Sequence, residues 1–181
     1  MNFFLTGKTV YMRPLQASDL TEKYLSWLND SEVCEFNSHA TFPYTFEKLE
    51  TFYKQLQESA NVNIVLAIIF KETDEHIGNI SLQNINWISR NAEYAILLGN
   101  KSFWNKGIAI EASLLICEYG FERLNLHRIY CGTSSKNLGM QKLASKIYMK
   151  EEGRREEAMY KNGVFVDIIE YGVLKKDFKK I

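Results

Sequence analysis

The sequence predicts an α/β fold built on a mixed β-sheet of about seven strands flanked by helices. The first observation is a block of three strands joined by short turns, from residue 63 to residue 98, which is typical of an antiparallel meander. The second is that helical and strand patterns alternate after residue 98, which is typical of parallel strands joined by a crossover helix. Together they indicate a sheet that is antiparallel in one part and parallel in another.

The N-terminal part supplies one short strand and one helix. Residues 9–13 form the strand, and Pro14 ends it because proline cannot donate a hydrogen bond to a ladder. The helix extends to about residue 28, with apolar side chains at helical spacing. Ser18 or Asp19 is expected to cap it, since both side chains accept hydrogen bonds from free helical amides.

The middle of the chain supplies one helix and the meander. Residues 29–43 are irregular, and a helix follows over about 46–57. Residues 63–70 are a nearly continuous run of β-branched side chains, as expected of a strand buried on both faces. The other two strands cover about 76–88 and the stretch that ends at residue 98. These elements predict a central sheet with at least one helix packed on it.

The C-terminal part returns to alternating elements. The expected order is a crossover helix over 110–123, a strand over 128–132, a helix over 137–147, and a hairpin of strands 156–160 and 164–173. Asn162 and Gly163 suit a type I′ turn, because both central residues of that turn need a positive φ. The mixed charges of residues 151–157 are expected on an exposed bend.

Composition narrows the class of protein. A chain of 181 residues with 46% hydrophobic residues predicts one domain over residues 1–181. Because 22 basic residues balance 22 acidic ones, no overall charge favours nucleic acid or an anionic membrane. No signal peptide or spanning apolar run is apparent, so a cytoplasmic protein is expected. The sequence leaves a homodimer open.

The cysteines and histidines indicate neither a disulfide framework nor a metal site. The three cysteines are far apart, and Cys117 falls on the apolar face of a predicted helix. No ligand spacing joins the cysteines to His39, His76 or His127, so no metal is expected.

Residues 104–112 form the most informative segment. They connect a predicted strand to a predicted helix through small residues, including Gly107 and Ala109. Such a turn leaves backbone N–H groups unpaired at the positive end of the helix dipole, where a phosphate or pyrophosphate can bind. On the turn alone, an ordinary tight connection, whose glycine only eases the turn, is the favoured interpretation.

Four blocks in the right order resemble the GNAT superfamily of acetyl-CoA-dependent N-acetyltransferases, over essentially the whole chain. The blocks are residues 10–14, 104–112, 126–129 leading to Asn137, and 160–167. The likeness is to the branch that includes the ribosomal-protein N-terminal acetyltransferases (RimJ/RimL-like). It implies a centrally splayed sheet and acetyl-CoA as co-substrate. Trp104 departs from the Gln or Arg that starts the superfamily's pyrophosphate loop.

The resemblance assigns a donor site. Backbone amides of the turn are expected to cradle the pyrophosphate, and the pantetheine arm is expected to pair with the strand before it. Asn137 is expected to hold the arm from the other side of the splay, although a simple N-cap is an alternative. The residues assigned to the donor are Ile96, Leu97, Leu98, Trp104, Asn105, Lys106, Gly107, Ile108, Ala109, Asn137 and Met140.

Glu93 is the candidate general base, as a lone carboxylate just ahead of an apolar run. The alternative is a glutamate at the rim of the sheet, paired with Arg90 or another cation. The general acid stays open, because Ala144 occupies the position where many family members carry a tyrosine. Three hydroxyls lie nearby in the sequence, in Ser134, Ser135 and Tyr148.

The acceptor site is assigned by resemblance alone. Phe36, His39 and Tyr44 fall in the irregular stretch and are expected to touch the acceptor, although ordinary loop packing is an alternative for each. The last hairpin, with Asp167 and Glu170, is expected to form a second wall.

The predicted function is direct transfer of acetyl from acetyl-CoA to a primary amine, since no cysteine is poised to form an acyl-enzyme. The expected acceptor is a small amine such as an amino sugar or its nucleotide. Two alternatives stay open, namely a protein N-terminus as acceptor and a non-catalytic regulator that binds acyl-CoA.

Overall fold

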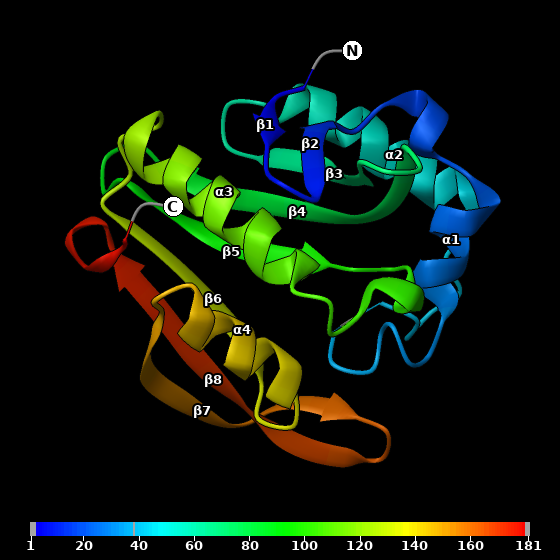
Figure 1. Cartoon of the computed structure of the whole chain (residues 1–181). Helices are drawn as coiled ribbons and strands as arrows, with labels where there is room; N and C mark the ends of the chain where they lie inside the picture. Colours follow the sequence, from blue (N-terminus) through cyan, green and yellow to red (C-terminus); the bar gives the residue numbers. More distant parts are fainter. Residues whose placement is uncertain (1–2, 38, 180–181) are drawn as a thin grey trace.

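The fold is described by a computed structural model that covers residues 3–37 and 39–179 (Figure 1). Within those residues, eight strands form one sheet in the order β1-β2-β3-β4-β5-β6-β8-β7. The strands are β1 (Leu5–Thr6), β2 (Val10–Pro14), β3 (Ile64–Phe70), β4 (Glu75–Asn86), β5 (Asn91–Leu97), β6 (Arg128–Ser134), β7 (Lys150–Lys161) and β8 (Val164–Leu174). The α-helices are α1 (Glu22–Asn29), α2 (Phe46–Glu58), α3 (Ile108–Glu122) and α4 (Leu138–Lys146).

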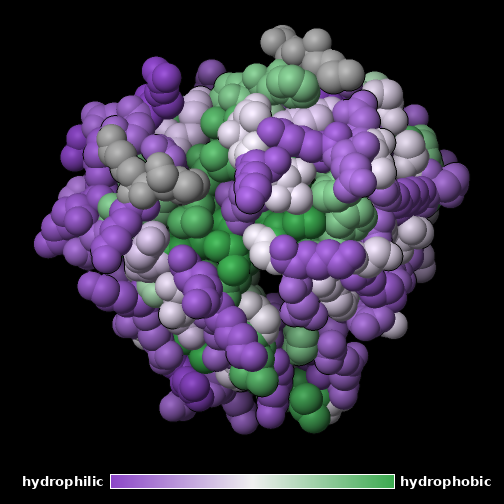
Figure 2. All heavy atoms as spheres, viewed as in Figure 1, coloured by the Kyte–Doolittle hydropathy of each residue, from purple (hydrophilic) through white to green (hydrophobic). Residues whose placement is uncertain are grey.

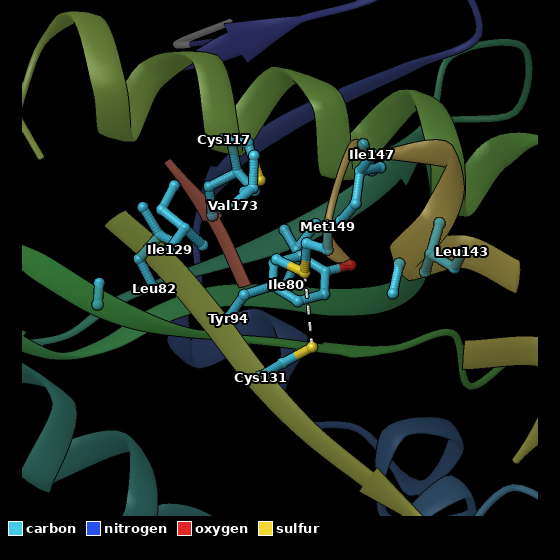
Figure 3. Packing of buried hydrophobic residues seen from close by; sticks show 14 of the residues in the cluster. Ile80, Leu82, Tyr94, Cys117, Ile129, Cys131, Leu143, Ile147, Met149 and Val173 are labelled. Atoms are coloured by element: carbon cyan, nitrogen blue, oxygen red, sulfur yellow. Dashed lines mark hydrogen bonds between the residues drawn. The ribbon is translucent and has the colours of Figure 1, made fainter. Parts of the chain in front are cut away.

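Helices cover both faces of the sheet. In Figure 1, α3 and α4 lie on the face toward the viewer, and α2 lies behind β3. The larger buried cluster joins α3 and α4 to the strands, and Ile80, Tyr94, Cys117 and Ile129 belong to it (Figure 3). A second cluster packs α1 and α2 against the opposite face, through Trp27 and other side chains. The sheet is therefore the middle layer of three, as the buried run in β3 predicts.

The sheet splays at its only parallel pair among the described strands. The two strands β5 and β6 pair solely from Asn91–Glu93 to Arg128–Tyr130, although each strand is seven residues long. Helix α3 is the crossover between them, and β6 continues into an antiparallel pair with β8. The strand edges that face each other beyond Glu93 are consequently free. This arrangement confirms the mixed, centrally splayed sheet that the sequence analysis predicts.

At the N-terminus one strand was not predicted and one expected helix cap was wrong. The eighth strand, β1, is two residues long and carries too short a pattern to predict. Thr21, not Ser18 or Asp19, caps α1, because its side chain accepts from Tyr24 N at 3.2 Å. Asp19 instead lies in a 3₁₀ turn, where its carboxylate binds the Arg13 guanidinium.

The predicted bend at residues 151–157 was also wrong, because β7 begins at Lys150. This strand lies at the edge of the sheet, exposes most of its side chains and contains two register shifts. An edge strand of this kind has no alternating apolar pattern for the sequence to reveal. The hairpin turn itself is as predicted, with φ values of 52° at Asn162 and 83° at Gly163.

Candidate active site

A cleft of about 730 Å³ opens where β5 and β6 separate. Its walls come from the loop between α1 and α2, the second half of β5, the turn before α3, part of β6, and α4. Figure 2 shows a hollow near the centre of the face that carries α3 and α4. The splay of the sheet therefore produces a site that both faces of the sheet help to line.

Every residue that the sequence analysis assigns to the donor lines this cleft. These residues are Ile96, Leu97, Leu98, Trp104, Asn105, Lys106, Gly107, Ile108, Ala109, Asn137 and Met140. Glu93 and Phe36 line it as well. Segments up to about one hundred residues apart in sequence thus meet around one space, since Phe36 and Asn137 border the same cleft.

The turn before α3 has the backbone geometry of an anion site. Gly107 is the N-cap of α3 with a φ of 77°, and Asn105 has a φ of 59°. A Cβ on Gly107 would meet no heavy atom within 4 Å, so the positive φ, not lack of room, favours glycine. No side chain caps the helix, and its first hydrogen bond runs from Glu111 N to Gly107 O at 3.1 Å. The amides of the first turn therefore have no partner within the helix.

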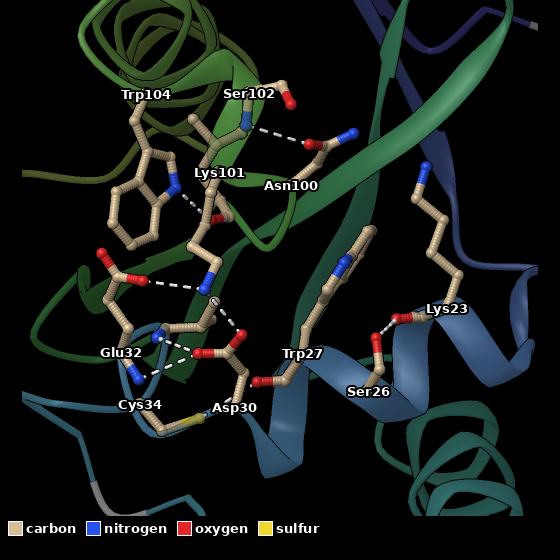
Figure 4. A network of polar contacts seen from close by, with 12 residues as sticks. Lys23, Ser26, Trp27, Asp30, Glu32, Cys34, Asn100, Lys101, Ser102 and Trp104 are labelled. Atoms are coloured by element: carbon tan, nitrogen blue, oxygen red, sulfur yellow. Dashed lines mark hydrogen bonds and ion pairs between the residues drawn. The ribbon is translucent and has the colours of Figure 1, made fainter.

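Two hydrogen-bonded contacts hold this turn in place. Trp104 Nε1 donates to Leu98 O at 2.7 Å, which ties the turn to the end of β5 (Figure 4). On the other side, Tyr94 Oη lies 2.5 Å from Ser113 Oγ, which donates to Ala109 O at 2.5 Å. Because the serine proton is used in that bond, Tyr94 is the donor to Ser113. The turn is thus fixed at both ends by side chains of the chain itself.

The two strand edges of the splay differ in what they present. Beyond Glu93, the β5 backbone has no β6 partner, so its edge can pair with an extended ligand in the manner of an added strand. On the α4 side, Asn137 Oδ1 accepts from Met140 N at 3.0 Å. Asn137 is therefore the N-cap of α4 and also a wall of the cleft, so both interpretations of this residue hold.

Glu93 lies at the vertex of the splay. It is the last β5 residue that pairs with β6, opposite Tyr130, and its side chain is half-buried. Asn84 Nδ2 donates to Glu93 Oε2 at 3.0 Å. Among the described residues no ion pair joins Glu93 to Arg90, so the alternative of a glutamate neutralised by that arginine is not what the structure has. Burial is the main cause of the raised pKa of Tyr130, and the negative charge of Glu93 raises it further.

The three hydroxyls considered for a general acid lie outside the cleft lining. These are Ser134, Ser135 and Tyr148, and Tyr148 packs its ring on Phe178. The hydroxyl residues that do line the cleft are Tyr94 and Thr133, which the sequence analysis missed. Burial raises the pKa of Tyr94, and its proton is engaged with Ser113.

The loop between α1 and α2 forms the opposite wall. Phe36 lines the cleft, but His39 and Tyr44 do not. His39 stacks edge-on against Tyr44 at 5.9 Å, and burial, followed by the charge of Lys161, lowers the pKa of His39. The sequence analysis missed the other loop residues of the lining, which are Glu32, Val33, Glu35 and Asn37.

Lysines from distant elements hold this loop. Lys101 Nζ lies 2.8 Å from Asp30 Oδ2 and 2.7 Å from Glu32 Oε2 (Figure 4). Lys161 Nζ, at the end of β7, donates to Asn37 O at 3.0 Å. The loop is therefore anchored both to the segment before the α3 turn and to the C-terminal hairpin.

The expectation that Asp167 and Glu170 of the last hairpin form a second wall of the acceptor site was wrong. Asp167 and Glu170 do not line the cleft. Asp167 pairs with Arg154 at 2.9 Å, and Glu170 pairs with Arg155 at 2.6 Å. Both carboxylates are thus used within the β7–β8 hairpin.

The cleft lining carries charged side chains of both signs, on different elements. The lining at the turn before α3 and on α4 contains Lys106, Lys142 and Lys146. The lining at the α1–α2 loop and the vertex of the splay contains Glu32, Glu35 and Glu93. The lysines favour an anionic ligand, and Glu35 and Glu93, which form no ion pair within the described residues, favour a cationic one.

Two further properties concern only the part of the chain that the structure describes. No cluster of three or more histidine, cysteine, aspartate or glutamate side chains there is arranged to hold a metal ion. No described helix is both long enough and apolar enough to cross a membrane.

Three features together define a transferase that binds an acyl-coenzyme A. They are the splayed mixed sheet, the unpaired edge of β5 and the unpaired backbone amides at the start of α3. The model of the acetyltransferase (GNAT) domain matches residues 9–150, and the chain belongs to this family. It is an N-acetyltransferase that uses acetyl-CoA as its donor.

Relatives of known sequence and structure agree with this assignment. The chain is 30% identical to "Probable N-acetyltransferase YjcK" of Bacillus subtilis, over 96% of this chain and 98% of that protein. It is 25% identical to the spermidine N(1)-acetyltransferase of Escherichia coli, over 96% of this chain and 90% of the relative. The spermidine N-acetyltransferase of Vibrio cholerae, solved in complex with CoA and spermine, superposes with a TM-score of 0.85 at 25% identity, over 94% of this chain and 98% of that one.

Proposed function

We propose that this enzyme transfers acetyl directly from acetyl-CoA to a primary amine of a small polycationic acceptor of the polyamine class. The observation that carries the proposal is the set of carboxylates in the cleft lining. Glu32, Glu35 and Glu93 border the space next to the donor strand. Two of the relatives named above act on spermidine, which fits such a lining.

The same carboxylates argue against the amino-sugar nucleotide named in the sequence analysis. A nucleotide carries phosphates, and Glu35 and Glu93 would repel them, since neither forms an ion pair within the described residues, whereas Glu32 is paired with Lys101. A polyamine instead offers one amine to the thioester and further ammonium groups to the remaining carboxylates. Glu35 is available for this, because its carboxylate has no ion-pair or hydrogen-bond partner within the described residues.

Cys131 supports direct transfer without an acyl-enzyme. This cysteine lines the cleft, but its side chain is buried and its Sγ lies 3.6 Å from Met149 Sδ (Figure 3). Burial raises the pKa of the Cys131 thiol to about 12. The thiol is therefore protonated at neutral pH and is a poor nucleophile.

We infer that Glu93 accepts the proton of the attacking amine. In the reaction the amine nitrogen bonds to the thioester carbonyl carbon, the carbon–sulfur bond breaks, and the coenzyme A thiolate leaves. One proton must leave the amine, and one must reach the thiolate. Glu93 is the carboxylate at the vertex of the splay, and its hydrogen bond from Asn84 orients it there.

The test is a thiol-release assay with acetyl-CoA and four acceptors: spermidine, glucosamine, an amino-sugar nucleotide and a peptide with a free N-terminus. Spermidine is expected to react fastest. Faster reaction of the peptide would favour a protein N-terminal acetyltransferase. Absence of reaction with every amine, together with tight CoA binding, would favour a regulator that binds acyl-CoA.

Two variants separate catalysis from acceptor binding. Glu93→Gln should lower kcat by about 100-fold or more, with the Kd for CoA unchanged. Glu35→Gln should raise the KM for spermidine about fivefold or more and leave the KM for a monoamine unchanged, since it removes one charge contact. Glu50→Gln on the exposed face of α2 is the matched control, and it should change none of these values.

A further inference from the structure

The lysines of the cleft lining carry more positive charge than the turn before α3 accounts for. Lys106 belongs to that turn, but Lys142 and Lys146 line the cleft from α4. All three side chains are exposed. Within the described residues none of the three forms an ion pair, and the only contact of their ammonium groups is that of Lys106 with the Phe103 ring, 5.6 Å away.

The two α4 lysines are arranged to act on one group. They are four residues apart, so they share a face of the helix and are separated by about 6 Å along its axis. Gly139 lines the cleft from the same face. A Cβ built there would meet only Asn137 Oδ1, at 3.6 Å, so the helix surface at Gly139 is uncrowded. A ligand can therefore approach α4 closely between its first turn and the two ammonium groups.

The donor carries a third phosphate group, separate from its pyrophosphate. Coenzyme A carries a pyrophosphate and, separately, a 3′-phosphate on the ribose. The amides at the start of α3 and the Lys106 side chain match a pyrophosphate in charge and place. The 3′-phosphate, with up to two negative charges, needs its own cations, and Lys142 and Lys146 form no ion pair with any side chain that the structure describes.

We propose that Lys142 and Lys146 form a binding site for the 3′-phosphate of coenzyme A. The pair makes the enzyme selective for coenzyme A over dephospho-coenzyme A, which lacks only that phosphate. The inference rests on the donor and is independent of the acceptor. A failure of the polyamine proposal would therefore leave it intact, and the reverse also holds.

The experiment is calorimetric titration of the full chain with CoA and with dephospho-CoA. The wild-type protein should bind CoA about tenfold or more tightly than dephospho-CoA, because a charged phosphate contact is lost with the smaller ligand. Lys142→Met combined with Lys146→Met should abolish this preference. The double variant should bind both ligands with the affinity that the wild type has for dephospho-CoA, within about twofold.

Lys136→Met is the matched control. Lys136 is an exposed lysine close to the start of α4, but it does not line the cleft. This variant should keep the wild-type preference. Equal binding of CoA and dephospho-CoA by the wild type would overturn the proposal. So would an equal loss of affinity for both ligands in the double variant, because that result would mean a diffuse charge effect. Circular dichroism and the melting temperature verify that each variant is folded.

Discussion

Trp104 Nε1 donates a 2.7 Å hydrogen bond to Leu98 O, and this bond joins the turn before α3 to the end of β5. The two residues are six apart in sequence, and the 3₁₀ turn Lys101–Phe103 lies between them. The strand that is expected to pair with the pantetheine arm and the turn that is expected to hold the pyrophosphate are therefore one preformed unit. Preorganisation of this kind lowers the entropic cost of binding an extended ligand.

Trp104→Phe should weaken donor binding with little effect on catalysis. The phenyl ring keeps most of the apolar contact but cannot donate to Leu98, so the KM for acetyl-CoA should rise about threefold to tenfold. Steady-state kinetics at saturating acceptor measure this value. Trp87→Phe is the control, because Trp87 Nε1 donates a similar bond to Asn61 O at 2.9 Å and neither residue lines the cleft. An unchanged KM for acetyl-CoA in Trp104→Phe would mean that the hydrogen bond from Trp104 to Leu98 plays no part in binding the donor.

Gly107→Ala should destabilise the fold by about 1 kcal/mol, because the φ of 77° is unfavourable for a residue with a Cβ. Thermal unfolding measures the effect, and calorimetry with CoA should show weaker binding as well. Gly153→Ala serves as the comparison, since its Cβ also meets no atom within 4 Å but its φ is not in the left-handed region. If both variants melt at the same temperature, backbone strain at Gly107 is not significant.

Asp19→Asn should destabilise the protein in a pH-dependent way. Burial acts to raise the pKa of Asp19, but hydrogen bonds from Arg13 and from Gln16 N outweigh it and leave the pKa below its ordinary value. A carboxyl with a lowered pKa in the folded state stabilises the fold above its unfolded pKa of about 3.9. That stability is lost as the pH falls through the folded value.

The substitution should therefore cost about 2–4 kcal/mol at pH 7, since it leaves the Arg13 guanidinium without its buried partner. Urea unfolding at pH 7, 5 and 3.5 gives the free energy of unfolding of both proteins. The difference between wild type and variant should be smallest at the lowest pH. Asp177→Asn removes a partly exposed carboxylate 3.7 Å from Lys150 and should change stability by less than about 0.5 kcal/mol. An equal difference in the free energy of unfolding at all three pH values would contradict the stabilising role of the Asp19 carboxylate.

Lys101→Met should affect the acceptor and not the donor. Lys101 binds Asp30 and Glu32, and the Asp30 carboxylate accepts from Glu32 N at 2.9 Å and Val33 N at 3.1 Å. Because the pair is exposed, we expect a modest rise of about threefold in the acceptor KM. The KM for acetyl-CoA should stay the same. Lys101→Arg should restore the acceptor KM, and Lys23→Met, outside the cleft lining, should have no effect. A change confined to the acetyl-CoA KM would refute this role.

That the residues assigned to the donor line one cleft could be predicted because their signals are local. A strand, a small-residue turn and a helix follow one another within residues 91–122, and each has its own pattern. The position of Asn137 at the start of α4 is likewise local, since its side chain caps the helix that follows. Local hydrogen bonds and local periodicity determine these features, so the order of residues suffices to predict them.

The acceptor half could not be predicted in the same way. The path of residues 30–37 depends on Lys101 and Lys161, which are about 70 and 125 residues further along the chain. No periodicity in the loop indicates that Glu32 and Glu35 reach the cleft while His39 does not. The strand predicted over 156–160 was too short for a related reason. The register of β7 is set by β8, and most of its side chains are exposed, so its sequence carries no apolar pattern.

The elements that line the cleft also differ in the kind of atom they offer. The amides before and within the first turn of α3 and the free edge of β5 are backbone groups, which survive most substitutions of the side chains that carry them. The wall that we propose for the acceptor depends on carboxylate side chains in an irregular loop. A few codon changes in that loop could therefore give the enzyme a new amine acceptor while its acetyl donor stayed the same. The splayed sheet thus provides a constant chemical step on which new substrate ranges can evolve.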